Sequence, residues 1–396
     1  MTLTKPIAAQ PPTTAQTQNH PHSPMCALRA VATCLMATSN TSVRADRVAR
    51  RGRGAPPSRR SSIEFGVTIL PDPPCSRFVE LVRLAEDCGF DWAYTYDSHI
   101  LWQEGCVLVT AAAVQTERIG LGFCVTNPGT REPTVTASFH ATLNSIIPGR
   151  VVVMIGRGDS ARRTIGLQPV KIAEFEAATA LIRDMANGRP VTWNGKEIAL
   201  EWAQGHPRIP VWVAGYGPRA LAVAGRQADG VVIQLADPDI VDWIMGQARV
   251  AAEAGGRAPL ELAPVVCAPV SIGDDMAAAR DTVRWFPAMV SNHVVDLLKR
   301  YDQSMLPESL TSYLARREFY DYSDHSRQGA KHGEFVDDET CDRFCILGTI
   351  EDHIAKLREL EAHGVEQFNI YLMTGNREGI LRAYGEHIIP LFKGGG

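Results

Sequence analysis

A short apolar run passes directly into a polar loop in the segment Val151-Val152-Val153-Met154-Ile155-Gly156-Arg157-Gly158-Asp159-Ser160. The run has the length of a buried strand, and Asp159 follows its end within a few residues. In parallel α/β folds, catalytic and ligand-binding groups gather at the carboxyl ends of the strands. The segment therefore predicts a strand whose C-terminal end contributes a carboxylate to a site.

Two other segments share this layout. They are Ala93-Tyr94-Thr95-Tyr96-Asp97-Ser98-His99 and Val211-Trp212-Val213-Ala214-Gly215-Tyr216-Gly217-Pro218. Each places Gly, Asp or His directly after a predicted strand. Because the carboxyl ends of parallel strands meet at one edge or mouth, the three segments together indicate one shared site.

Strand-like and amphipathic segments alternate from Ile63 onward. The predicted strands are 63–70, 91–96, 119–126, 150–155, 210–214, 230–235, 260–272 and 367–373. The predicted helices are 76–88, 107–115, 134–147, 172–187, 218–227, 240–254, 274–300 with a break at Pro287, and 377–391. Eight strands in alternation with helices predict an α/β fold, a (β/α)8 TIM barrel. A doubly wound open sheet is the alternative, but the first strand ends in Leu70-Pro71-Asp72-Pro73-Pro74, which cannot cradle a pyrophosphate.

Three segments fall outside this alternation. Residues 190–207 predict a hairpin insertion, since Asn194-Gly195 is a strong turn signal. Residues 304–338 are polar and rich in Tyr, His and Arg, and they predict a lid-like insertion after the seventh strand. Residues 1–62 hold nine Lys or Arg and one acid, Asp46, without periodicity. They predict a disordered basic extension before a barrel domain at 63–396, with a targeting segment or a nucleic-acid-binding tail as alternatives.

The composition excludes several classes of protein. The chain is 45% hydrophobic and 21% charged, as in soluble globular proteins, and no apolar run approaches the ~18 residues of a membrane span. The nine cysteines form no C-x-x-C pair and no zinc-binding spacing. We therefore expect reduced thiols in a cytoplasmic protein, with no metal site.

Four motifs resemble the luciferase-like superfamily of barrel oxidoreductases, and most closely its coenzyme F420-dependent branch, over about residues 63–392. Asp97-Ser98-His99-Ile100-Leu101-Trp102 resembles the Asp-x-x-x-x-Trp stretch after the second strand. Cys124-Val125-Thr126-Asn127-Pro128 resembles the bulged end of the third strand. Gly156-Arg157-Gly158-Asp159 resembles a Gly-x-Gly-Asp/Glu turn, and residues 213–221 resemble the phosphate loop with its helix.

The resemblance implies an enzyme that transfers a hydride between the deazaflavin F420 and a small organic substrate. One alternative is an FMN-dependent luciferase-like monooxygenase, and a second is a flavin-binding barrel without catalysis. A homodimer is usual among the relatives. Neither nucleic acid nor membrane is an expected partner of the barrel.

The cofactor's phosphate is expected at Gly215, Tyr216, Gly217, Pro218 and Arg219. Glycines let backbone N–H groups approach an anion closely, proline suits a first helical turn, and a helix N-terminus carries partial positive charge. The alternative is an ordinary turn between a strand and a helix.

The cofactor's ring is expected nearer the third and fourth strands. The resemblance implies that Cys124–Val125 is a non-prolyl cis peptide behind the ring. Gly156 and Gly158 either hold the cofactor or make room for its ring. Asn127 either hydrogen-bonds the ring edge or shapes a turn.

Four side chains are candidates for the chemistry. Asp97 is expected to face the ring or the substrate, or else to cap a loop. His99 is a possible proton donor or a packed or solvent-facing histidine, and Ser98 stands where sugar-phosphate dehydrogenases of this branch have histidine. Trp102 shields the reacting centre or belongs to the core. Asp159 matches a family glutamate that acts as a general acid, with Arg157, Arg162 and Arg163 beside it.

Overall fold

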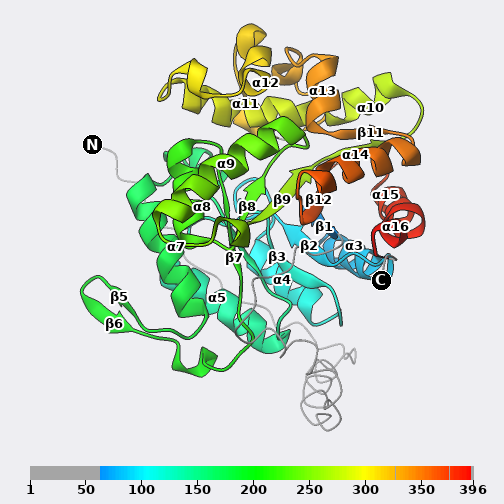
Figure 1. The fold of residues 1–396 in the computed structure, drawn as a ribbon. Helices are drawn as coiled ribbons and strands as arrows, with labels where there is room; N and C mark the ends of the chain where they lie inside the picture. The colour runs from blue at the N-terminus through cyan, green and yellow to red at the C-terminus, as the bar shows by residue number, and fades with distance from the viewer. Residues whose placement is uncertain (1–62, 326, 374, 394–396) are drawn as a thin grey trace, which may run out of the picture. The chain divides into compact units, whose positions relative to one another are not determined.

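Eight parallel strands form a barrel in the computed structural model, which describes residues 63–325, 327–373 and 375–393 (Figure 1). The strands are β1 (Glu64–Ile69), β2 (Trp92–Thr95), β3 (Gly120–Phe123), β4 (Val153–Ile155), β7 (Val211–Ala214), β8 (Gly230–Ile233), β9 (Ala263–Ala268) and β12 (Gln367–Leu372). Their order in the sheet is β3-β2-β1-β12-β9-β8-β7-β4. Parallel bridges from Leu121 to Val151 and from Thr126 to Ile155 bring the outermost strands together. The predicted (β/α)8 barrel is confirmed.

A helix covers each strand from outside. In chain order these helices are α3 (Cys75–Asp87), α4 (Gly105–Ala113), α5 (Pro133–Ile146), α7 (Ile172–Ala186), α8 (Pro218–Gln227), α9 (Pro238–Ala254), α14 (Ile350–Ala362) and α15 (Arg377–Ala383), the last continued by η7 (Tyr384–Ile388) and α16 (Ile389–Lys393). Each buries an apolar stripe; α3 buries Phe78, Leu81 and Val82, for example, and the chain leaves it at Gly89 with φ 84°. The sequence prediction missed α14, whose apolar stripe is narrow, with His353, Leu357 and Leu360 buried.

The long strand predicted at 260–272 is two strands. β9 ends at Ala268, and β10 (Val270–Ile272) leaves the barrel to pair in parallel with β11 (Ile346–Gly348). Pro269 lies between β9 and β10 and has no N–H to donate to a ladder, so pairing cannot run through it. The prediction of one continuous strand was wrong for this reason.

The predicted helix 274–300 also divides, but not at the proline. α10 (Met276–Val283) and α11 (Trp285–Leu298) meet at Arg284. Pro287 lies in the first turn of α11, where a missing N–H breaks no intrahelical bond. The prediction of a break at Pro287 was therefore wrong. Both helices belong to the excursion between β9 and α14 and lie together beside the barrel (Figure 1).

The segment 190–207 contains the antiparallel pair β5 (Val191–Trp193) and β6 (Lys196–Ile198). Asn194 and Gly195 form the turn with φ values of 50° and 77°. Two consecutive positive φ angles are those of a type I′ turn, which matches the twist of a hairpin.

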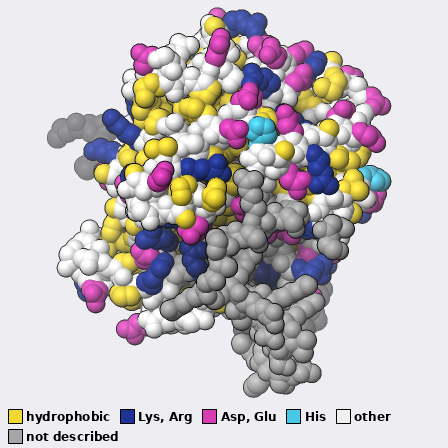
Figure 2. Space-filling view, in the orientation of Figure 1, with side chains coloured by type: hydrophobic (Ala, Val, Ile, Leu, Met, Phe, Trp, Pro, Cys, Tyr) yellow, Lys and Arg dark blue, Asp and Glu magenta, His cyan; other side chains and the backbone are white. Residues whose placement is uncertain are grey.

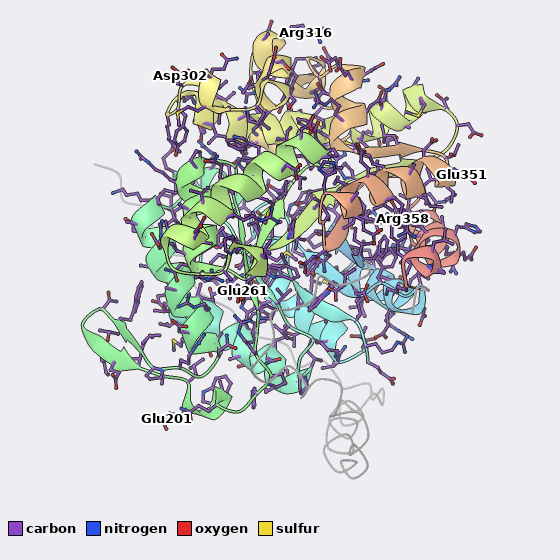
Figure 3. All side chains as sticks on the ribbon, viewed as in Figure 1. Glu201, Glu261, Asp302, Arg316, Glu351 and Arg358 are labelled. Atoms are coloured by element: carbon purple, nitrogen blue, oxygen red, sulfur yellow. The ribbon has the colours of Figure 1, made fainter. Side chains whose placement is uncertain are left out.

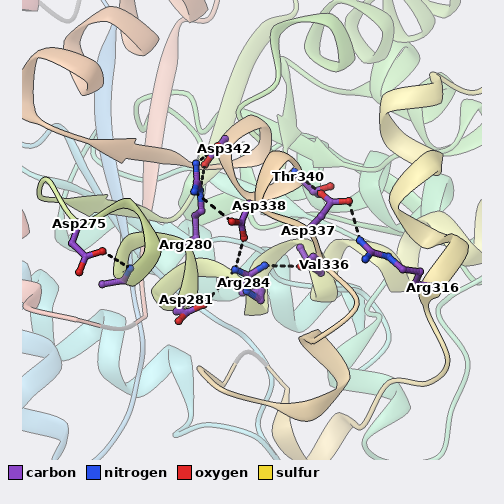
Figure 4. A network of polar contacts seen from close by, with 11 residues as sticks. Asp275, Arg280, Asp281, Arg284, Arg316, Val336, Asp337, Asp338, Thr340 and Asp342 are labelled. Carbon is purple, nitrogen blue, oxygen red and sulfur yellow. Dashed lines mark hydrogen bonds and ion pairs between the residues drawn. The ribbon is translucent and has the colours of Figure 1, made fainter.

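The lid segment, residues 304–338, consists mainly of short helical turns: η3 (Gln303–Met305), α12 (Glu308–Thr311), η4 (Ser312–Arg316), η5 (Tyr322–Asp324) and η6 (Lys331–Gly333). It leads into α13 (Asp338–Phe344). Figure 4 shows how this end is tied to α10: Arg284 pairs with Asp338 at 2.7 Å and donates to the carbonyl of Val336 at 2.6 Å, while Arg280 pairs with Asp342 at 2.7 Å. Several such contacts together fix the base of the lid segment more firmly than one exposed pair would.

Charged side chains lie mainly on the outside. Glu201, Asp302 and Arg316 point away from the barrel in Figure 3, and acidic and basic groups are interspersed over the face shown in Figure 2. The described residues include no helix long and apolar enough to cross a membrane, and no cluster of His, Cys, Asp or Glu arranged to hold a metal. The predicted N-terminal extension, residues 1–62, lies outside the described residues.

Candidate active site

A cavity of about 440 Å³ opens at the carboxyl ends of the barrel strands. The loops after β2, β3, β4 and β7 form its wall, and α11 and the lid segment lie over it. The predicted site residues that line it are Asp97, Trp102, Cys124, Val125, Asn127, Gly156, Gly158, Asp159, Gly215, Tyr216, Gly217 and Arg219. Two others do not line it: His99 is exposed beyond its rim, and Pro218 begins α8. The strand-end segments therefore share one site.

Asp97 is a buried carboxylate with several partners. Its Oδ2 accepts from Arg131 Nη1 at 2.5 Å and from Thr126 Oγ1 at 2.6 Å, and its Oδ1 accepts from Arg131 Nη2 at 2.9 Å. Burial alone would lower the pKa of Arg131, but the hydrogen bonds and charge of Asp97 outweigh it and raise that pKa. This ion pair braces the wall between β2 and β3. Asp97 was expected to face the ring or the substrate, or else to cap a loop. Its contacts are those of a structural ion pair that joins two strand ends.

The end of β3 forms the base of the cavity. The Cys124–Val125 peptide is cis, as the resemblance implied, and Cys124 lies 3.6 Å from the Tyr371 hydroxyl and 3.8 Å from the Cys267 sulfur. Cys124 and Tyr371 are buried, whereas Val125 is partly exposed to the cavity. This surface is mostly apolar, as a flat ring requires.

Asn127 takes the second of its two expected roles. Its Oδ1 accepts from the Gly129 N–H at 3.0 Å and from Thr130 Oγ1 at 3.2 Å, so it shapes the turn after the bulge. Gly158 lies against it with φ 76°, and a Cβ added there would come within 2.9 Å of Asn127 Oδ1. Glycine at 158 is thus required both by the backbone angle and by this close approach.

Asp159 stands at the N-cap position of α6 (Ser160–Arg163), after β4, but its side chain makes no capping hydrogen bond. Its Oδ1 accepts from Arg163 Nε at 2.6 Å, and its Oδ2 accepts from Tyr322 Oη at 3.1 Å. Burial alone would raise the pKa of Asp159, but the neighbouring His293 and Arg163 and the Tyr322 hydrogen bond lower it. Asp159 is therefore a carboxylate at neutral pH. In this arrangement it can accept a proton, but it does not carry the proton that a general acid must give.

Aromatic side chains from the lid segment and α11 cover the cavity. The Tyr322 and His325 rings stack with centroids 5.8 Å apart, and His325 Nδ1 lies 2.8 Å from the Tyr320 hydroxyl. Burial lowers the pKa of His325 to about 4, so it is neutral at pH 7. His293 of α11 stacks on Tyr216 with centroids 5.0 Å apart.

The loop after β7 and the start of α8 line the cavity. Gly217 is the N-cap of α8 and provides no side-chain cap, and the Arg219 N–H reaches the Tyr301 hydroxyl at 3.4 Å. A Cβ at Gly217 would come within 2.5 Å of Leu297 Cδ2, so α11 packs against this loop only because residue 217 is glycine. The Ala220 N–H donates to the Gly217 carbonyl at 2.9 Å, so the partial positive charge of the helix start and the Arg219 side chain are what this loop offers to an anion.

Sequence reasoning missed three groups of this site. Gln234 donates to the Tyr371 hydroxyl at 2.7 Å and accepts from Tyr216. It could have been found because it lies near the C-terminal end of the predicted strand 230–235. Arg131 and His293 come from a loop and from the middle of a helix, and no local pattern marks them.

Comparison with known proteins gives the site a family context. The family model described as luciferase-like monooxygenase matches residues 55–367. The chain belongs to the luciferase-like monooxygenase family. This family assignment agrees with the resemblance of its four strand-end motifs.

Relatives within the family match the chain over nearly their whole length. The 5,10-methylenetetrahydromethanopterin reductase of Methanopyrus kandleri is 31% identical, over 84% of this chain and 99% of that protein. The F420-dependent glucose-6-phosphate dehydrogenase of Nakamurella multipartita is 25% identical, over 80% and 92%. The solved structure of the coenzyme F420-dependent tetrahydromethanopterin reductase from Methanopyrus kandleri superimposes with a TM-score of 0.65 at 25% identity, over 84% of this chain and all of that one.

Proposed function

We propose that this chain is a coenzyme F420-dependent oxidoreductase that transfers a hydride between the deazaflavin and a small organic substrate. The observation that carries the proposal is the pairing, in one cavity, of an apolar ring slot with the N-terminal end of α8 and the Arg219 side chain. The relatives that match 80–84% of this chain over 92–100% of their own length, including those whose names state F420 dependence, support it.

The residues present fit such a cofactor. Val125, Gly156 and Ala214 lie close together in the cavity wall, where a Cβ at Gly156 would come within 3.0 Å of Val125 Cγ2 and 3.8 Å of Ala214 Cβ. A side chain at 156 would fill space that a planar ring needs. The N-terminal end of α8 and the Arg219 side chain, which belong to the same cavity wall, suit the phosphate of its tail.

The chain's own residues bind the cofactor, orient the substrate and supply the proton. When bound, the deazaflavin supplies two-electron chemistry at one ring carbon, which leaves the protein to provide the proton. His293 is the group best placed for it, because it lines the cavity within electrostatic reach of the Asp159 carboxylate. His325 of the lid segment lines the cavity, and Tyr322 stacks on it.

The substitution His293→Gln distinguishes a proton-transfer role of His293 from a structural role. In His293→Gln the amide keeps most of the side-chain volume but cannot carry a proton between donor and acceptor. We expect kcat to fall by about 10²–10⁴-fold and F420 affinity to stay within about twofold. An equal loss in cofactor affinity and kcat would instead make His293 a support for Tyr216.

The substrate is proposed to be a small molecule with a reducible C=C, C=N or C=O bond, or its reduced form. The test is turnover by the purified enzyme with reduced F420 under argon. We expect F420 oxidation without oxygen uptake. Tight binding of FMN and substrate-dependent oxygen consumption would support the monooxygenase alternative instead.

We further propose a cytoplasmic homodimer. The seven cysteines of the described part are free thiols, which suits a reducing compartment. Val107 and Val114 of the α4 region and Val135 and Ile146 of α5 are 45–67% exposed on neighbouring helices, which favours a second copy there. Light scattering on the purified chain tests this: twice the chain mass is expected, and a monomer that persists at micromolar concentration contradicts it.

A further inference from the structure

Four cationic side chains line one side of the cavity. They are Arg157 after β4, Lys171 at the N-cap of α7, Arg219 in the first turn of α8, and Arg300 just beyond α11. Lys171, Arg219 and Arg300 are exposed, while Arg157 is half-buried. The cations come from four separate segments, so their grouping is a product of the fold.

Contacts between neighbouring segments link the four positions in the order Arg219, Arg300, Arg157 and Lys171, a set that we call the arc. Arg219 lies at one end, where its N–H contacts the hydroxyl of Tyr301, the residue after Arg300. Arg300 lies near Arg157. Burial and, after it, the positive charge of Arg300 lower the pKa of Arg157. Arg157 Nε donates to the Val170 carbonyl at 2.6 Å, beside Lys171 at the far end.

None of these four cationic side chains forms an ion pair within the described part of the chain. No carboxylate among the described residues lies within ion-pair distance of any of the four side chains. The nearby acids already have partners: Asp159 and Asp296 share Arg163, at 2.6 and 2.5 Å. Like charges held together without counter-charges favour binding of an anion with several negative groups.

We propose that the arc of Arg157, Lys171, Arg219 and Arg300 is a subsite for the polyanionic tail of the deazaflavin, in which carboxylates follow the phosphate. This inference rests on the proposed F420 dependence. A single phosphate at the start of α8 would engage Arg219 alone, whereas the arc continues past it to Lys171. A chain of glutamyl carboxylates that leads out of the cavity has the length and charge to contact Arg300, Arg157 and Lys171.

The test compares three deazaflavins on the full chain. The probes are the riboflavin-like precursor without phosphate, F420 with one glutamate, and F420 with five or more. Affinities are measured by fluorescence quenching for wild type, for Lys171→Gln/Arg300→Gln and for Lys299→Gln. Lys299 is the matched control, since it neighbours Arg300 but pairs with Asp296 at 3.3 Å and does not line the cavity.

We expect the double variant to bind the long-tailed F420 about tenfold more weakly, with a shallower salt dependence. The loss should shrink with one glutamate and vanish for the precursor, and the control should match wild type. Equal losses for one and many glutamates would assign the arc to the phosphate and overturn the proposal. So would unchanged affinity for all three probes, or a change confined to the KM of a substrate.

The outcomes also separate this inference from the function on which it rests. If the wild-type chain binds F420 and the double variant binds it equally well, only the tail subsite is wrong. If the wild-type chain binds no deazaflavin at all, the proposed function and the tail subsite both fall.

Discussion

The Tyr322 hydroxyl donates a hydrogen bond to Asp159 Oδ2 at 3.1 Å and thereby joins the lid segment to the end of β4. Burial raises the pKa of Tyr322, so the hydroxyl keeps its proton and remains a donor. Asp159 is ionised and is the stronger acceptor for it. This bond ties the lid segment to the charge of Asp159 in the cavity wall.

Removing the hydroxyl should loosen the lid segment without unfolding the barrel. In Tyr322→Phe we expect amide hydrogen exchange in residues 312–325 to accelerate about tenfold, because a hydrogen bond to a charged group is lost. Exchange in β4 should not change. Phe319→Leu, an exposed substitution in the same segment, is the control. Unaltered exchange in Tyr322→Phe would mean that other contacts hold the lid closed.

Arg131→Gln should destabilise the fold. It leaves the buried Asp97 charge with one neutral hydrogen bond, from Thr126, and truncations of this kind cost about 3–5 kcal/mol. Urea denaturation measures the loss. Arg83→Gln on the exposed side of α3 is the control, and Asp97→Asn/Arg131→Gln should recover part of the stability. A loss below about 1 kcal/mol would show that the pair is not a structural anchor.

Gly158 and Gly166 have nearly the same φ, so comparing them distinguishes backbone strain from a steric clash in the cavity. Gly158 and Gly166 have φ of 76° and 77°, but a Cβ would meet Asn127 at 2.9 Å only at 158 and meets no atom within 4 Å at 166. We expect Gly158→Ala and Gly166→Ala each to lose about 1–2 kcal/mol of stability. Only Gly158→Ala should also weaken F420 binding, by at least about tenfold. Equal cofactor affinity in both variants would remove Gly158 from the site.

Stability should fall as the solution becomes mildly acidic. Burial lowers the pKa of His140, His325 and His353 to about 4, from an ordinary value near 6.5. Between these values the unfolded chain binds protons that the folded chain does not, so stability is lost as the pH falls from about 6.5 to 4. Urea midpoints measured at pH 7.5 and 5 test this expectation. A midpoint that is unchanged or higher at pH 5 would contradict it.

The sequence predicted the framework of the site because strand ends have a local signature. Asp97, Gly156 and Gly215 each follow an apolar run, and the barrel brings such positions together wherever strands are parallel. The boundary errors were also local. Pro269 ends a strand and Pro287 does not end a helix, since a proline's effect depends on whether its N–H would have been bonded.

The groups that sequence reasoning missed are far from their partners along the sequence. Arg131 reaches Asp97 across 34 residues, and Tyr322 reaches Asp159 across 163. His293 lies on a helix whose predicted pattern required only an apolar face. Such contacts depend on how segments pack, so they set the ionisation of Asp159 in a way that its own motif does not predict.

Cofactor choice tests the central claim most directly. The purified chain is titrated with F420 and, separately, with FMN, and binding is followed by quenching of cofactor fluorescence. The account predicts saturable binding of F420 at micromolar concentrations and FMN binding at least about 100-fold weaker, because the cavity pairs an apolar slot with an arc of cations that suits a long anionic tail. FMN binding as tight as F420 binding, or no F420 binding, would contradict it.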